Sequence, residues 1–572
     1  MASRVVACVA AILAVATSGS LGVEATSAAP PPRFAVVRSR GANEARASFV
    51  VEETGSLDDD GVAWASFEDG LNKTGWGVFK VHTNASFADD DQAYAAGMLE
   101  GYLTAPHIFT TARDVVQAIF KADTLPPKVR DFMEKQDAWT RASIKKHAAD
   151  DDLFRHVGYV MAQYDGLVDG YAKRAPQDVP SLENWQFAML NGVGDLIDLK
   201  QAMNRSEFAD LEKMDREAAE LLHARSGHCS ALVKVTADYS DLLMGHSSWY
   251  VFANTNRIFK HYYFDFNDES TAAKGISFSS YPGFLESLDD FYMLSSGIAW
   301  TQTTNSILNS SVYDLLQPQS LFAWQRVRAA SAIARSGEEW FETFRRNASG
   351  TYANQYMIVD HSRFEAGKPL QDGTLWVIEE MPGLVVGRDQ TETLRRGYWP
   401  SFNVPFYPEI YEGSGYPSVA AKQGNYFTYE LTARAKIFRR DHNTVEDLDS
   451  LKAILRSNDY LHDPFSLDDG TPNPMYAICS RGDLIKDKPL PDGCYDTKVT
   501  SVRYGMAERR AQIINGMTRG LHGDSLPAFK WSQFPEMRHE GLPPVYDFDF
   551  MPTDPSMPET ADASERVDIA EI

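Results

Sequence analysis

The sequence lacks any apolar run long enough to cross a bilayer, whose hydrocarbon core requires about 20 consecutive apolar residues. A short apolar run at residues 5–16 follows Arg4 and precedes small residues at 17–20. That order is typical of a cleaved secretory signal peptide, and the alternative is a retained N-terminal anchor. We therefore expect a signal peptide and leader at residues 1–29 and a soluble protein, without a transmembrane segment, that enters the secretory pathway.

Basic side chains are scarce relative to acidic ones. The chain has 55 Lys and Arg against 79 Asp and Glu, which gives a formal charge of −24. Because nucleic-acid binding requires clustered cations that neutralise phosphates, this balance argues against a nucleic-acid partner. It also argues against tight docking on an anionic membrane surface.

Several common catalytic patterns are missing as well. The sequence has no Gly-rich phosphate-binding loop and no Gly-x-Ser-x-Gly turn. His, Cys and carboxylate residues form no set with metal-ligand spacing, and pairs such as Asp360-His361 and His462-Asp463 stand alone. We therefore expect no metal ion and no cofactor.

Cysteine is sparse, with four residues in 572. Cys8 leaves with the signal peptide, so three remain, and an odd number in an oxidising compartment implies one free thiol. Cys479 and Cys494 flank a short loop and are predicted to form a disulfide. Cys229 is then the free thiol.

Glycosylation acceptors agree with the secretory pathway. Asn-x-Ser/Thr triplets without Pro at the middle position occur at five sites: Asn72, Asn84, Asn204, Asn309 and Asn347.

Hydrophobic periodicity predicts both helices and strands, without a regular alternation of the two, and so favours an α+β chain of sheets layered with helices. Residues 21–56 are small, polar and Pro-containing and are interpreted as a flexible leader, and the acidic tail from about 552 is expected to be disordered. The expected strands are 62–67, 76–81, 230–237, 242–249, 275–280, 297–304, 355–360 and 374–379, and the expected helical regions are 92–189, 196–225, 324–345 and 444–456.

Cys229 opens the strand-turn-strand unit at 230–249 and follows the flexible segment 226–228. A thiol reacts as its thiolate and needs a neighbouring base or cation. Cleavage of the His228–Cys229 bond would release an α-amine on the same residue, and its reference pKa of about 7.7–8.0 suits a general base. The alternative is that Cys229 is a small buried hydrophobic residue.

Motifs spread along the chain favour the catalytic interpretation, because together they resemble the phospholipase B-like family from about residue 60 to about 550. The segments that carry this resemblance are 227–234 (GHCSALVK), 241–243 (DLL), 246–249 (HSSW), 74–77 (TGWG), 99–104 (LEGYLT), 278–283 (FSSYPG), 349–355 (SGTYANQ), 434–438 (RAKIF), 480–484 (SRGDL) and 493–498 (GCYDTK).

The resemblance implies an N-terminal-nucleophile αββα sandwich, in which antiparallel sheets are layered between helices. It also implies self-cleavage between His228 and Cys229. The N-terminal fragment would span 30–228 and the C-terminal fragment 229–572, and both would belong to one fold. It places the protein in the lysosome or outside the cell.

Site residues are carried over from the family by motif. Cys229 would be the nucleophile and, through its amine, the base. His246 and Trp249 would lie beside it on the second strand of the hairpin, Thr304 would line the site, Asn403 would donate to an oxyanion, and Arg434 would hold the thiolate. Each of the last five also has a purely structural alternative. His246 could be a hydrogen-bonded polar residue and Trp249 a core aromatic. Thr304 could be an ordinary strand residue, Asn403 a turn residue and Arg434 a surface residue.

Three functions remain open. The first is a hydrolase that removes fatty acyl groups from glycerophospholipids. The second is an amidase that acts on N-acyl amides or small peptides through the same thioester. The third is a lipid-binding glycoprotein without catalysis, against which the presence of Cys229, Asn403 and Arg434 argues.

Overall fold

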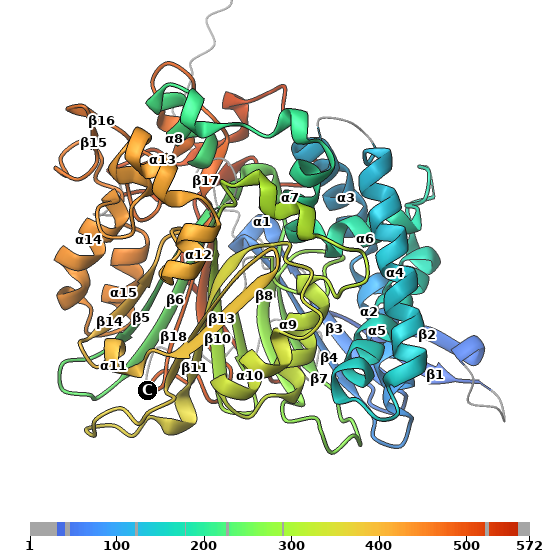
Figure 1. The fold of residues 1–572 in the computed structure, drawn as a ribbon. Helices are drawn as coiled ribbons and strands as arrows, with labels where there is room; N and C mark the ends of the chain where they lie inside the picture. Colours follow the sequence, from blue (N-terminus) through green and yellow to red (C-terminus); the bar gives the residue numbers. More distant parts are fainter. Residues whose placement is uncertain are drawn as a thin grey trace, which may run out of the picture.

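The computed structural model describes residues 31–40, 46–120, 124–177, 179–224, 228–288, 291–520 and 525–558. The expected signal peptide and leader at 1–29 lie outside these residues, as does most of the acidic tail. Figure 1 shows a body of sheets flanked by helices.

The larger sheet has eleven strands, and every neighbouring pair in it is antiparallel except β4 and β7. Its order is β13 (Leu384–Asp389), β12 (Leu375–Met381), β11 (Asn354–Asp360), β10 (Ile298–Thr304), β9 (Phe291–Leu294), β8 (Gly275–Ser280), β7 (Arg257–Tyr263), β4 (Trp76–Thr83), β3 (Ala63–Gly70), β1 (Arg33–Ser39) and β2 (Phe49–Thr54).

The second sheet has seven strands and carries Cys229. It is antiparallel throughout its described pairs. Its order is β14 (Tyr398–Ser401), β5 (His228–Val235), β6 (Leu242–Val251), β18 (Asp496–Ser501), β19 (Ala511–Asn515) and β22 (Met551–Thr553), and β17 (Asp492–Cys494) also pairs with β6. Two further pairs of short strands belong to neither of these sheets. They are β15 (Leu467–Asp468) with β16 (Thr471–Pro472), and β20 (Phe529–Lys530) with β21 (Val545–Tyr546).

The α-helices of the described residues lie between residues 71 and 455. They are α1 (Leu71–Thr74), α2 (Asp89–Leu103), α3 (Ala105–Phe120), α4 (Pro127–His147), α5 (Asp152–Arg174), α6 (Asn184–Asn191), α7 (Val193–Met203), α8 (Arg216–Ala224), α9 (Ala323–Ile333), α10 (Gly337–Phe344), α11 (Thr391–Leu394), α12 (Pro408–Gly413), α13 (Tyr416–Gln423), α14 (Ala433–Asp441) and α15 (Leu448–Leu455). None of the helices in the described ranges is long and apolar enough to cross a membrane.

Alternation of side chains along the strands separates the core into layers. On β9, Phe291 and Met293 join a cluster with Val233 and Met244 of the second sheet, so the two sheets pack face to face. The other face of the larger sheet packs against α2, α9 and α10. The other face of the second sheet packs against α13, α14 and α15. Figure 1 shows α4 and α5 at one side of the molecule and α14 and α15 at the other.

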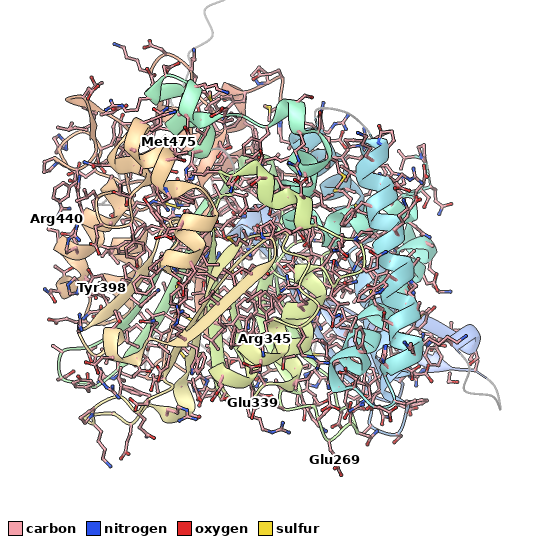
Figure 2. The ribbon with its side chains drawn as sticks, viewed as in Figure 1. Glu269, Glu339, Arg345, Tyr398, Arg440 and Met475 are labelled. Carbon is pink, nitrogen blue, oxygen red and sulfur yellow. A yellow bond between two sulfur atoms is a disulfide. The ribbon has the colours of Figure 1, made fainter. Side chains whose placement is uncertain are left out.

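Close packing of α2 on α5 depends on glycine. A Cβ added at Gly101 would collide with the carbonyl oxygen of Leu167, and one at Gly170 would collide with that of Met98. The two helices can therefore approach this closely only because these positions lack a side chain. Figure 2 shows that charged side chains such as Glu269 and Arg440 lie at the periphery of the molecule.

The structure confirms the α+β class, the hairpin that follows Cys229 and the main helical regions, and it corrects three boundaries. The leader does not extend to residue 56, because β1 and β2 pair with β3 in the larger sheet. The described structure continues to residue 558, and β22, at the expected start of the tail, pairs with β19. The helix expected at 324–345 is two helices, since the Ser336 hydroxyl accepts from the backbone N–H of Glu339 and caps α10.

The predicted disulfide is confirmed. Cys479 and Cys494 are bonded, and their Cα atoms are 5.0 Å apart. Cys494 is the last residue of β17, which pairs with β6, and both half-cystines pack against Trp249. The bridge therefore supports the strand that lies opposite Cys229.

Candidate active site

Cys229 is the second residue of β5 and lies directly opposite Ser248 of β6. Within the described ranges it is the one cysteine that is not in a disulfide, and only 5% of it is exposed. Residues 225–227, just before β5, lie outside the described residues. The backbone on the N-terminal side of the predicted scissile bond is therefore described only from His228 onward. His228 itself begins β5, paired with Trp249.

Strand geometry decides which residues share the face of Cys229. Residues directly opposite each other in an antiparallel pair lie on the same face, and successive residues alternate. Ser248 and His246 therefore share the face of Cys229, which looks into the space between the sheets. Trp249 lies on the other face. His246 is one pair further along, opposite Ala231.

Asn403 follows β14 in a left-handed backbone conformation (φ 69°), which asparagine tolerates better than most residues. Its side-chain Oδ1 accepts from the backbone N–H of Cys229 at 3.2 Å and from Nη1 of Arg434 at 2.8 Å. Its Nδ2 donates to the carbonyl oxygen of Thr304 at 2.6 Å. The two donors at Oδ1 fix the orientation of the amide, so Asn403 ties β5, β10 and α14 together.

Arg434 is not on the surface. It is buried in the first turn of α14, with its guanidinium 4.3 Å from the centre of the Trp249 ring. Nη1 donates to the carbonyl oxygen of Cys229 at 2.6 Å and lies 3.3 Å from the hydroxyl of Ser230. Burial lowers the pKa of Arg434 to about 10, which still leaves it charged at neutral pH. A permanent positive charge therefore lies at the backbone of Cys229.

Thr304 closes the site from the larger sheet. It is the last residue of β10, and it lines a small cavity together with Cys229 and Ser248. That cavity has a volume of about 20 Å³, which is close to the space that one water molecule needs. Its remaining lining residues are Ile197, Trp249, Tyr250, Tyr281, Leu288, Tyr352 and Tyr495. A substrate acyl group needs more room than this cavity provides.

A buried polar network, to which the sequence motifs assigned no role, adjoins Cys229. Lys498 Nζ donates to the Ser248 hydroxyl and to Oδ1 of Asp496, at 2.7 Å each. Asp496 also accepts from the backbone N–H of Ser248 at 3.0 Å and pairs with Arg257 at 3.1 Å. Asp496 and Lys498 fall in the 493–498 motif, and that motif was the sequence signal that could have indicated them as site residues. Nothing in the sequence singles out Arg257.

The structure thus brings Trp249, Thr304, Asn403 and Arg434 together around Cys229, and it places His246 on the same strand face as Cys229. Buried charged groups inside a core next to a nucleophilic side chain are typical of functional sites. The arrangement offers a thiol, a fixed amide and a fixed cation at the start of a strand.

The glycosylation acceptors differ in exposure. Asn72, Asn204 and Asn347 are exposed. Asn84 and Asn309 are half-buried, and their side-chain amides donate to the carbonyl oxygens of Gly61 and Gly413 at 3.1 and 3.3 Å. Glycosylation at all five stays a prediction, and the exposed three are the most accessible.

Comparison with known proteins agrees with the motifs. A family model described as Phospholipase B matches residues 63–553. The Bos taurus protein named Phospholipase B-like 1 is 43% identical over 503 residues, which cover 87% of this chain and 89% of the relative. The Homo sapiens protein of the same name is 42% identical over 531 residues, which cover 92% and 93%. A Crotalus adamanteus protein named Phospholipase B is 43% identical over 524 residues, which cover 90% and 91%.

Proposed function

Since the chain belongs to the phospholipase B family and is a hydrolase, we propose that it removes fatty acyl groups from glycerophospholipids, with Cys229 as an N-terminal nucleophile. The active form would arise when the chain cleaves its own His228–Cys229 bond. The fold would then be an N-terminal-nucleophile αββα sandwich, and its two-sheet layering supports this assignment.

The observation that carries the proposal is the position of the backbone nitrogen of Cys229. It donates to Asn403 Oδ1, which is itself held by Arg434. After cleavage the same nitrogen would be an α-amine oriented by Asn403. Burial and the nearby guanidinium would both disfavour protonation of this amine and so favour its neutral, proton-accepting form.

Cleavage would proceed in two steps. The Cys229 thiol attacks the carbonyl carbon of His228, the C–N bond breaks, and the acyl group moves from nitrogen to sulfur. Water then hydrolyses this thioester, which leaves a carboxylate on His228 and a free thiol and amine on Cys229.

Lipid hydrolysis would use the same groups. The amine takes the thiol proton, the sulfur attacks the ester carbonyl, and the amine returns the proton to the departing glycerol oxygen. Water hydrolyses the acyl thioester, and the fatty acid leaves. Asn403 would orient the amine and offer its second N–H to the oxyanion, because a primary amide carries two such donors. Trp249 would fix the Arg434 guanidinium, while Thr304 and His246 would shape the pocket.

The experiment compares the purified protein with Cys229→Ala on diacyl phospholipids, lysophospholipids and N-acyl amides of one chain length. Cys229-dependent release of fatty acid from the phospholipids is the expected result. Release from the amides alone would replace the proposal with the amidase alternative. Tight lipid binding with no Cys229-dependent release from any substrate would contradict both hydrolases.

A further inference from the structure

A larger groove adjoins the small cavity at Cys229. Its volume is about 410 Å³, within the roughly 300–1,000 Å³ of pockets that hold small ligands. The groove and the small cavity share Ile197, Tyr250 and Thr304 as lining residues, so the two spaces are neighbours at the end of β10. A molecule whose reactive bond lies at Cys229 would reach this groove past the side chains that the two spaces share.

Most of the groove wall is apolar. The contributing side chains come from the end of α3, from α7, from the segment between α7 and α8, from α8 itself and from the loop after β10. They include Ile119, Ile197, Phe208, Leu211, Leu222 and Ile307. Leu222 is 38% exposed and is one of seven exposed large apolar side chains in the described ranges. A wall of this composition suits an aliphatic chain.

One cation lines the groove close to the Cys229 cavity. Lys200 is three residues after Ile197 on α7, so the two side chains lie on one helix face, with Cβ atoms about 5–6 Å apart. Lys200 Nζ donates to the carbonyl oxygen of Ile119 at 3.0 Å. Because an ammonium has three N–H donors, that bond leaves two for an anion.

Two carboxylates and a histidine also line the groove. Asp198 accepts from the Tyr313 hydroxyl and from the backbone N–H of Tyr352, both at 2.8 Å, and burial raises its pKa to about 6. Burial lowers the pKa of His223 to about 3, so it is neutral. Asp492 is buried beside the end of β6. In mildly acidic solution the lining of the groove thus carries less negative charge than at neutral pH.

We propose that this groove holds the fatty acyl chain of the substrate and that Lys200 contacts the phosphate of its headgroup. The inference rests on the proposed function, because it takes Cys229 as the point of hydrolysis. It also gives the bound lipid a direction. The chain runs away from Cys229 along the apolar wall, and the phosphate lies one helical turn from Ile197, near the entrance to the small cavity.

The first experiment measures binding and needs no catalysis. Calorimetry on the purified protein with Cys229 intact compares a 16-carbon ether-linked lysophospholipid, which has no ester bond to hydrolyse, with the neutral 16-carbon alkylglycerol. Lys200→Met should weaken binding of the phosphate-bearing lipid about tenfold relative to the neutral one. Leu222→Asp places a charge on the apolar wall and should weaken both lipids at least tenfold. Lys146→Met and Leu461→Asp, at exposed positions elsewhere, are the matched controls.

The second experiment measures kcat/KM for esters with 4 and 16 carbons on protein that retains Cys229. Leu222→Asp should lower the ratio of the long to the short ester at least tenfold. Lipid binding that is equal in Lys200→Met, Leu222→Asp and their controls would overturn the groove assignment even if Cys229-dependent hydrolysis is present. Groove-dependent binding without Cys229-dependent hydrolysis would leave the groove standing and reject the proposed function.

Discussion

Replacement of Arg434 tests the electrostatic part of the site most sharply. Arg434→Met keeps the length and the contact with Trp249 but removes the donor to the Cys229 carbonyl oxygen and to Asn403 Oδ1, at 2.6 and 2.8 Å. A hydrogen bond from a charged group contributes about 1.5–3 kcal/mol. Loss of one such contact in the transition state lowers the rate about 10- to 100-fold, because 1.36 kcal/mol corresponds to a factor of ten.

The assay follows fatty acid release and chain cleavage in parallel, with thermal unfolding as a check on folding. Arg434→Met should lose at least tenfold in the rate of release, and Arg434→Lys should recover part of it, since an ammonium keeps the charge but not the planar geometry. Arg440→Met is the matched control, because Arg440 lies on the same helix at the molecular edge, in exposed ion pairs (Figure 2). A folded Arg434→Met protein with rates within twofold of wild type would refute this role.

Three further predictions concern stability. Replacing Cys479 and Cys494 with Ala opens a loop of 15 residues and should lower the free energy of unfolding by about 3 kcal/mol, measured by denaturant titration; an unchanged midpoint would contradict this. Burial raises the pKa of Asp195 and of Asp198 to about 6, so the folded state binds more protons than the unfolded state between about pH 4 and 6, and stability should rise as pH falls from 7 to 5. That rise should shrink when both are changed to Asn, and an identical pH dependence of Tm in the double variant would refute the assignment. Gly101→Ala should destabilise the α2–α5 contact by about 1–3 kcal/mol, and an unaltered Tm would show that the helices can separate freely.

Local patterns were sufficient for the elements that depend on neighbours in sequence. The hairpin of β5 and β6 follows from alternation around a four-residue turn, and the disulfide follows from two cysteines that flank one loop. The strands β1 and β2 were missed because their surroundings are small and polar. Their β-branched pairs, Val36-Val37 and Val50-Val51, were the available signal.

Contacts between residues far apart in the sequence could not be predicted from local sequence patterns. β4 lies parallel to β7, with Trp76 opposite Arg257, although nothing between them in sequence indicates that contact. The network that joins Ser248 to Lys498 likewise connects residues from distant parts of the chain. The roles proposed for Asn403 and Arg434 came from family resemblance. In the structure both side chains contact the backbone of Cys229, and Arg434 also donates to Asn403.

The most direct test of the central claim is intact-mass analysis with N-terminal sequencing of the purified protein and of Cys229→Ala. Wild type should give one fragment that ends at His228 and one that begins at Cys229, held together by packing, because the disulfide in the described ranges lies entirely within the second fragment. Cys229→Ala should remain a single, inactive chain. A Cys229→Ala protein that stays uncleaved yet hydrolyses lipid at the wild-type rate would contradict the mechanism.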